Sequence, residues 1–328
     1  MEDVNNFRQV ERVSLTVLVD NKADLIVESS DHIQYFTDEP LLAEHGFSVL
    51  IRLDDSDGQI LWDAGVSKLA LIENLRRMKI DPRSITKIAL SHGHLDHYAG
   101  MTDLLNTMDI LPKGKEWGEK FTASDIEAWV DSHKIPIVMH PAAVRERWWM
   151  KDDGILEGPF LPPPQGEWEA AGAKIILSEV PYELGPGCWT TGFIQRNSFE
   201  KSGRPSQLHY RQGSELIRDD LDEDQAIGIN VKGKGLIVLS ACAHSGIVNT
   251  VEQVKQFFGI DKTYAILGGF HLAEASDDEI RETIDRVKDF GPKFVIPSHC
   301  TGFRAISQFA LEMPDEFIEG VVGATYLL

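Results

Sequence analysis

The sequence has few cysteines, no long apolar run and a shortage of positive charge. Its 328 residues include three cysteines, which form no disulfide framework and indicate a reducing compartment. No apolar segment approaches the length that spans a bilayer, and the polar first residues lack the apolar core of a secretion signal. We therefore expect a cytoplasmic protein with no membrane partner.

The charge balance is strongly acidic. The 52 Asp and Glu residues outnumber the 32 Lys and Arg residues, and the formal net charge is −20. Such a chain repels phosphate backbones, so we expect no nucleic acid partner. The charge does not identify a small substrate, because a bound metal ion can invert the field around a site.

Short apolar strands alternate with amphipathic helices along the chain. The predicted strands are residues 14–20, 47–53, 59–63, 86–90, 135–139, 174–177, 226–231, 235–239, 264–267 and 294–296. The predicted helices are residues 68–78, 98–107, 248–258, 277–290 and 301–311. Both halves resemble a mixed sheet with helices outside, which predicts an α/β fold, a four-layer αββα sandwich formed by a single domain over residues 1–328.

Two regions depart from this alternation. Residues 111–164, which contain Trp148, Trp149 and a run of three prolines, are expected to form a cap or insertion. Within them, residues 113–128 are polar and are expected to be irregular. Residues 185–214 are rich in Gly, Ser and Arg and are expected to form a long loop, a class of segment that is often functional.

A dense histidine cluster follows the strand predicted at residues 86–90. The segment SHGHLDHYAG places His92, His94, Asp96 and His97 within six residues. In an extended chain His92 and His94 point the same way, so both imidazoles can reach one ion. Asp96 and His97 come where the chain turns into a helix, and they can reach a second ion or support the first. Imidazole together with carboxylate suits zinc, iron or manganese, and strand ends are where α/β folds build sites.

Four donors from one loop cannot close a metal site, so other segments must contribute. His244, His271 and His299 all follow apolar strands predicted in the last third of the chain. We expect His244 and His299 to be ligands, whereas His271 is a ligand, a support for one or a substrate-facing group. Cys242 is either a thiolate ligand or a small buried residue. Asp63 either holds a metal-bound imidazole through its other nitrogen or is a turn residue.

These motifs resemble those of the metallo-β-lactamase superfamily. SHGHLDH is similar to its metal-binding signature, and ILWDAG is similar to its preceding strand with a supporting aspartate. EHGFSVLI, TTGFIQR, DEDQAIGINVKGKGLIVLSACAHSGIVNT, LGGFHL and PSHCTG resemble the branch named after archaeal dihydropterin–ribofuranosylaminobenzene 5′-phosphate synthase. The resemblance covers roughly residues 14–310 and implies the superfamily's sandwich fold. It does not identify a substrate, because lactonases, thioesterases, phosphodiesterases, nucleases and oxidoreductases share the fold.

Two features depart from the superfamily pattern. The segment GPGCWTTGF has no histidine where the superfamily has its third one, and the strand that would carry the bridging aspartate ends in ACAH. The resemblance therefore implies that His244 replaces the missing ligand and that Cys242 stands at the bridging position, with one ion or two unequal ions bound. Redox di-iron members have an acidic residue in place of His94, which favours hydrolytic chemistry here.

We therefore expect a hydrolase that uses metal-activated water on a small-molecule ester, phosphoester or lactone. The cofactor is one or two divalent ions, zinc first, with manganese or iron as alternatives. The expected ligands are His92, His94 and His244 for the first ion and Asp96, His97 and His299 for the second. Asp96 would also orient the nucleophile, and His271 would donate a proton to the leaving group. Arg196, in the long loop, either binds an anionic part of the substrate or is an exposed loop arginine.

Two other functions fit the same residues. A metal-dependent transferase would let an aromatic amine or ring carbon attack a pterin diphosphate in place of water, as the name of the branch suggests. A regulatory protein would use the fold to bind a small molecule, although a pure receptor has no need of open metal positions. The sequence does not indicate an oligomeric state.

Overall fold

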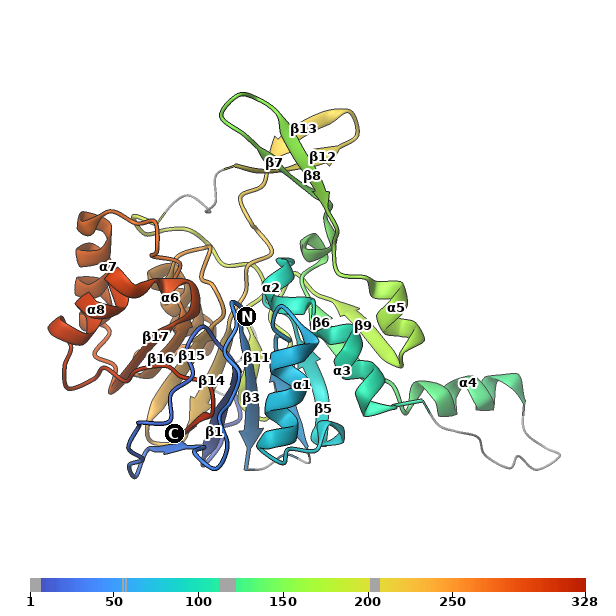
Figure 1. Cartoon of the computed structure of the whole chain (residues 1–328), viewed down its shortest axis with the longest axis horizontal. Coiled ribbons are helices and arrows are strands. Elements are labelled where there is room, and N and C mark those ends of the chain that lie inside the picture. Colours follow the sequence, from blue (N-terminus) through green and yellow to red (C-terminus); the bar gives the residue numbers. More distant parts are fainter. Residues whose placement is uncertain (1–6, 55, 57, 112–121, 201–206) are drawn as a thin grey trace.

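The computed structural model of the chain describes residues 7–54, 56, 58–111, 122–200 and 207–328. Part of the expected insertion, residues 112–121, and part of the expected long loop, residues 201–206, lie outside them. Two large sheets lie face to face with helices on their outer sides, and a small third sheet projects from one end (Figure 1). The predicted four-layer αββα sandwich is therefore confirmed.

The first large sheet has eight strands and is mixed. Its strands are β1 (Val13–Val19), β2 (Ile33–Tyr35), β3 (Ser48–Leu53), β4 (Gln59–Trp62), β5 (Ile85–Ala89), β6 (Ile135–Met139), β9 (Ala173–Leu177) and β18 (Ala324–Leu327). They follow the order β2-β18-β1-β3-β4-β5-β6-β9. The strands β4, β5, β6 and β9 are parallel, and the pairs on the other side of β4 are antiparallel.

The second large sheet has six strands and is also mixed. Its strands are β10 (Glu183–Gly185), β11 (Cys188–Thr190), β14 (Ile227–Val231), β15 (Gly235–Ser240), β16 (Thr263–Gly269) and β17 (Phe294–Ser298), in that spatial order. β14 and β15 form the predicted hairpin, and β15, β16 and β17 are parallel. The sequence did not predict β10 and β11, because each has three residues and lies at or near the segment expected to be a loop.

Three apolar layers hold the sandwich together. Trp62 and Leu239 belong to the core between the sheets, Leu71 to the layer beneath the helices of the first sheet, and Ile284 to the layer beneath those of the second. The helices on the first sheet are α1 (Lys68–Arg77), α3 (Met101–Met108) and α5 (Gln165–Ala170). Those on the second are α6 (Ile247–Phe258), α7 (Asp277–Asp289) and α8 (Phe303–Glu312). None of the helices in the described ranges is long and apolar enough to cross a membrane.

A further helix, α4 (Ala123–Asp131), lies in the segment that we expected to be irregular. It begins at a capping box in which Thr122 and Asp125 each accept a hydrogen bond from the other's backbone N–H. None of its residues is buried. The prediction of an irregular segment is wrong from Ala123 onward, and the helical spacing of Ile126, Trp129 and Val130 was the available signal.

Four strands form the small sheet, which we call the cap sheet. They are β7 (Arg147–Met150), β8 (Leu156–Phe160), β12 (Leu208–Gln212) and β13 (Glu215–Arg218), in the order β13-β12-β7-β8. β7 and β8 fall within the expected cap at residues 111–164, whereas β12 and β13 fall within and just after the expected long loop. Each hairpin needs the other to complete the sheet, so the sequence of one hairpin alone does not reveal it.

Candidate metal centre

The predicted metal ligands lie at the carboxyl ends of parallel strands in both sheets. Asp63 follows β4, and the histidine motif follows β5 with its second half in the short helix α2 (Leu95–Tyr98). In the second sheet, His244, His271 and His299 follow β15, β16 and β17. Because parallel strands end at the same edge of a sheet, all these loops come together at one end of the sandwich.

Backbone strain is concentrated in these loops. The φ angle is 59° at Asp63, 53° at Ala243, 47° at His271 and 48° at His299. A left-handed conformation costs a non-glycine residue on the order of 1–3 kcal/mol, and such residues cluster at functional sites. The strain occurs where the chain turns its donor side chains toward one point.

Three imidazoles form the first donor group. The ring centroid of His92 lies 4.5 Å from that of His94 and 4.6 Å from that of His244, and the last two are 4.8 Å apart. The Nε2 atoms of His92 and His244 are 3.1 Å apart, and Nε2 of His94 is buried with no hydrogen-bond partner among the described residues. Burial lowers the pKa of His92 and brings that of His94 to about 3, and nearby positive groups add a smaller effect in the same direction. Neutral imidazole nitrogens that converge in this way fit a divalent ion.

Asp96, His97 and His299 form the second donor group. The Oδ2 atom of Asp96 lies 3.5 Å from Nε2 of His97 and 3.4 Å from Nε2 of His299. Burial favours a neutral carboxyl, but the two imidazoles outweigh it and hold the pKa of Asp96 well below its usual range. An ionised carboxylate between two imidazoles is a donor set that zinc, iron and manganese accept.

Cys242 lies between the two groups. Its Sγ atom is 3.3 Å from Nε2 of His97, and the side chain is 3% exposed. The sulfur forms one cluster with His92 and His244 and another with His97 and His299, and in each cluster the donor atoms lie within 4.8 Å of one another. Cys242 therefore faces both groups, which is the geometry that a bridging position requires.

Asp63 and Ser91 support the histidines from the protein side, and both are fully buried. Asp63 Oδ2 lies 2.7 Å from Nδ1 of His97 and accepts a hydrogen bond from the Ser91 hydroxyl at 2.7 Å. Because that hydroxyl donates to Asp63, it accepts from Nδ1 of His92 at 2.8 Å and leaves His92 Nε2 free to bind an ion. Burial opposes a charge on His97, but Asp96 and Asp63 outweigh it and raise its pKa to about 10.

The sequence analysis did not assign roles to Ser91 and His45. Ser91 lies between the end of β5 and His92, and this position could have indicated that it supports the metal ligands. The Nε2 atom of His45 lies 3.4 Å from Oδ2 of Asp96, and its ring stacks on that of His299 with centroids 5.0 Å apart. His45 is exposed and lies in the loop before the amino end of β3, whereas the other donors follow the carboxyl ends of strands, so the strand-end pattern did not indicate it.

Of the two remaining candidates, His271 lies beside the metal centre and Arg196 does not. The ring of His271 lies 4.3 Å from that of His244, and Nδ1 of His271 is buried with no hydrogen-bond partner among the described residues. Arg196 donates hydrogen bonds to the backbone oxygens of Asp220 and Leu221. These contacts hold the chain segment before β14 in place. Arg196 is not among the residues that line the large cavity at the metal centre, so its role in substrate binding stays a prediction.

A cavity of about 580 Å³ opens above the centre. One wall consists of the donor residues His94, Asp96, Cys242, His244 and His271. The opposite wall is apolar and largely supplied by the cap sheet and its flanks, with Tyr98, Trp149, Pro159, Phe160, Leu161 and Leu208. A substrate in this cavity would have an apolar or aromatic part against the cap sheet and a reactive bond at the centre.

The two arginines that line this cavity are already paired. Arg145 forms an ion pair with Asp222. Arg147 is 3% exposed, and it pairs with Asp219 at 2.8 Å and with Glu223. Since both guanidinium groups have carboxylate partners, apolar contact is the main recognition chemistry that this wall offers.

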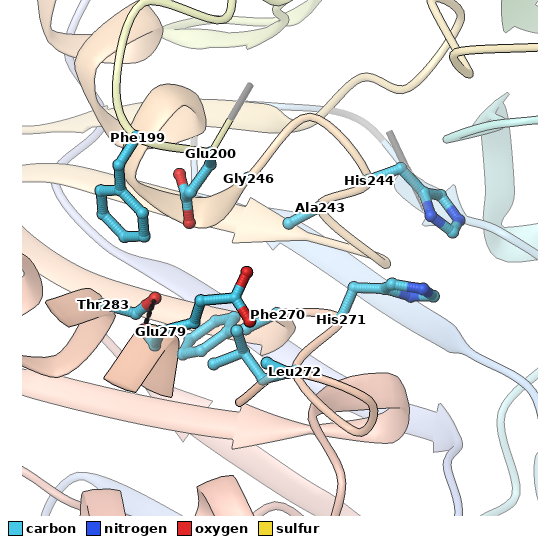
Figure 2. Close-up of a pocket in the computed structure, with 11 residues that line it drawn as sticks. Phe199, Glu200, Ala243, His244, Gly246, Phe270, His271, Leu272, Glu279 and Thr283 are labelled. Carbon is cyan, nitrogen blue, oxygen red and sulfur yellow. Dashed lines mark hydrogen bonds between the residues drawn. The ribbon is translucent and has the colours of Figure 1, made fainter. Parts of the chain in front are cut away.

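A smaller cavity of about 150 Å³ shares His244 and His271 with the first. In Figure 2 these imidazoles lie on one side of it, and the carboxylates of Glu200 and Glu279 lie on the other. Glu200 accepts hydrogen bonds from the backbone N–H groups of Val248 and Asn249 at the start of α6, at 3.0 and 3.2 Å. Burial outweighs these bonds and raises the pKa of Glu200 to about 7.

Comparison with known proteins identifies the family. The sequence pattern of the Metallo-beta-lactamase superfamily matches residues 42–194. The 7,8-dihydropterin-6-methyl-4-(beta-D-ribofuranosyl)-aminobenzene-5'-phosphate synthase of Methanocaldococcus jannaschii is 30% identical over 285 residues, which are 85% of this chain and 88% of the synthase.

Solved structures show the same fold. The crystal structure of Tm1679, described as a metal-dependent hydrolase of the beta-lactamase superfamily, has a TM-score of 0.69 at 21% identity and covers 95% of this chain and 98% of its own. The metallo-beta-lactamase fold protein YhfI from Bacillus subtilis has a TM-score of 0.53 at 14% identity, with 97% and 100% covered. This chain therefore belongs to the metallo-β-lactamase superfamily, in the branch that includes the archaeal synthase.

Proposed function

We propose that this protein is a metal-dependent hydrolase that acts on a small molecule with an apolar or ring-containing part. The observation that carries the proposal is the pair of donor groups around Cys242, which reach a cavity with an apolar opposite wall through His94, Asp96 and His244. One or two divalent ions would bind there. Zinc fits the mixture of thiol, imidazole and carboxylate best, and manganese or iron are the alternatives.

The residues around the cavity have distinct tasks in such a reaction. A divalent ion in this site supplies a nucleophile by acidifying water, and it polarises a carbonyl or phosphoryl oxygen. Asp96 orients the nucleophile through its carboxylate, and His271 donates a proton to the leaving group. The apolar wall holds the body of the substrate and limits the entry of further water. An ester, a phosphoester or a lactone has the bond that this arrangement can cleave.

A metal-dependent transferase is the second candidate, and two observations favour it. The cavity wall carries Tyr98, Trp149 and Phe160, which suit a flat ring. The relative that is 30% identical is named as a synthase whose product joins a dihydropterin to an aminobenzene. In that reaction an aromatic amine or ring carbon would take the place of water and displace diphosphate from a pterin diphosphate.

The first test is the metal content of the native chain, measured by plasma mass spectrometry after purification without chelator or nickel affinity. A His92→Ala/His94→Ala double variant is measured beside it. One or two ions of zinc, manganese or iron in the native chain, lost in the variant, are expected. A native chain that binds no metal even after reconstitution would overturn both candidates.

The second test separates the two reactions. Phosphoester, lactone and ester panels are compared with a pterin diphosphate plus an aromatic amine acceptor, all in oxygen-18 water. Oxygen-18 in the product identifies hydrolysis, whereas an unlabelled coupled product identifies transfer. A metal-loaded chain that turns over no substrate but binds a small molecule tightly would instead favour a regulatory protein.

A further inference from the structure

A third donor cluster lies on the cavity side of the two histidine groups. The Sγ atom of Cys242, a ring nitrogen of His271 and the Sγ atom of Cys300 all lie within 4.8 Å of one another. Cys300 follows β17 and lines the large cavity, as do the other two residues. Three separate strand ends therefore contribute one soft donor each to a single point at the cavity wall.

The chemistry of this cluster differs from that of the histidine groups. Two thiols and one imidazole are soft donors, which favour zinc, cadmium or copper(I) over manganese, magnesium or calcium. Zinc and cadmium accept such a set in tetrahedral geometry, with a fourth position left for water or a substrate. The fourth position here would face the cavity, because all three donor residues line it.

The local backbone is adapted to this arrangement. His271 has a φ of 47°, and the residues next to the two cysteines, Ala243 and His299, have φ angles of 53° and 48°. A Cβ atom at Gly269 would lie 2.6 Å from Sγ of Cys300, so glycine leaves the space that the sulfur occupies. The Cys300 thiol points to the Cys242 backbone oxygen at 3.5 Å, which keeps the two cysteines side by side.

We propose that Cys242, His271 and Cys300 form a binding site for one thiophilic ion with a filled d shell, of the zinc and cadmium type. With the resident metal in place Cys242 is already a thiolate, so binding releases only the Cys300 thiol proton to solvent. It forms a metal–sulfur bond to Cys300, a metal–nitrogen bond to His271 and a further bond to the shared sulfur of Cys242. An ion there also occupies His271, so it blocks proton donation to the leaving group. That inhibitory consequence rests on the proposed function, whereas the binding itself does not.

Cadmium is the probe, because its bond to thiolate produces an ultraviolet charge-transfer band. Cadmium is titrated into the full chain with its resident metal in place, and plasma mass spectrometry follows both metals. The native chain should bind one additional cadmium ion and show a band of two thiolates. In Cys300→Ala the band should fall to about half, since one of two sulfur ligands is lost.

Two further variants make the result specific. Cys188→Ala is the matched control, because Cys188 lies in the core between the sheets and in none of the donor clusters among the described residues. It should keep the full band. His271→Ala should keep both thiolates but need at least roughly tenfold more cadmium, since the loss of a group that only supports a ligand already lowers metal affinity by about that factor.

Three outcomes would overturn the site: no cadmium band in the native chain, a full band in Cys300→Ala, or cadmium that merely replaces the resident ion with a one-thiolate band. An unchanged cadmium requirement in His271→Ala would contradict the site as proposed. The readout is spectroscopic, so a failure of every substrate panel would overturn the proposed function and leave this test intact.

Discussion

The Oδ2 atom of Asp63 lies 2.7 Å from Nδ1 of His97, and neither side chain is exposed to solvent. This contact fixes the imidazole with Nε2 toward Cys242 and Asp96. An Asp63→Asn variant removes the charge that orients His97, and we expect metal affinity to fall about 10- to 100-fold. Chelator competition measures the change. Asp103→Asn, at a half-exposed carboxylate outside the donor groups, is the control, and equal affinity in both variants would contradict the role of Asp63.

Gly93 separates the first two histidines of the motif, and its position leaves no room for a side chain. A Cβ atom there would lie 2.2 Å from the backbone oxygen of Ala143 and 2.8 Å from Nη1 of Arg147. Gly93→Ala should shift His92 and His94, lower metal content and destabilise the fold by about 1–3 kcal/mol. Metal analysis and thermal unfolding test this. Gly166→Ala, where a Cβ atom meets nothing within 4 Å, should change neither property adversely.

The metal centre was accessible to sequence reasoning because its donors follow short apolar strands. Burial makes β5, β15, β16 and β17 apolar, and the residues at their ends are therefore conspicuous when they are histidines. His45 had no such signal, because it lies in a loop and reaches Asp96 only when β3 and β5 both pair with β4. The proximity of Cys242 and Cys300 was also inaccessible, since the ends of β15 and β17 come together only when both strands pair with β16.

The strands of the cap sheet could not be predicted from the sequence. β12 reads LHYRQ, and its burial decreases from Leu208 to the exposed Gln212, so it shows no apolar alternation. It pairs with its neighbour β13 on one side and, on the other, with β7 from a distant part of the chain, where Trp149 lies opposite Leu208. A prediction that uses only neighbouring residues therefore assigns such a segment to a loop. The central strands β14, β15, β16 and β17 were predictable because they are buried on both faces, which makes each a continuous apolar run.

Tyr98 links the metal centre to the cap. Its hydroxyl donates to the backbone oxygen of Leu161 at 2.6 Å, and the residue directly follows His97. Tyr98→Phe should remove about 0.5–1.5 kcal/mol of cap attachment. We expect faster limited proteolysis near residues 156–161 and a raised KM, with unchanged metal content. Tyr264→Phe, on the second sheet, is the comparison, and equal proteolysis rates in both variants would contradict the link.

Glu200 makes folding stability depend on pH. Burial raises its pKa to about 7 from an ordinary value of 4.5, so the folded chain holds the proton more tightly than the unfolded chain does. Stability therefore falls as the pH rises between these two values, and the loss is complete above the higher one. Glu200→Gln lacks this titration. Its melting temperature relative to the native chain should rise from about pH 5 to about pH 8.

Thermal unfolding of the native chain and of Glu200→Gln from about pH 5 to about pH 8 gives the difference between their melting temperatures. The histidines titrate in both proteins, so their effect cancels in this difference. The loss at high pH is at most about 3.5 kcal/mol, because one pKa unit corresponds to about 1.4 kcal/mol. Glu169→Gln, at an exposed position in α5, should show a flat difference. A flat difference for Glu200→Gln as well would show that Glu200 is ionised in the folded chain throughout the range.

The two hairpins of the cap sheet impose an order on biosynthesis. β7 and β8 leave the ribosome first, and β9, β10 and β11, which belong to the two large sheets, emerge before β12 can return to pair with β7. Such non-local pairing forms slowly. The aromatic wall of the cavity is therefore assembled after both large sheets have begun to form, and a nascent chain that ends before β12 exposes Trp148 and Trp149 on an unpaired strand edge, where chaperones would be needed.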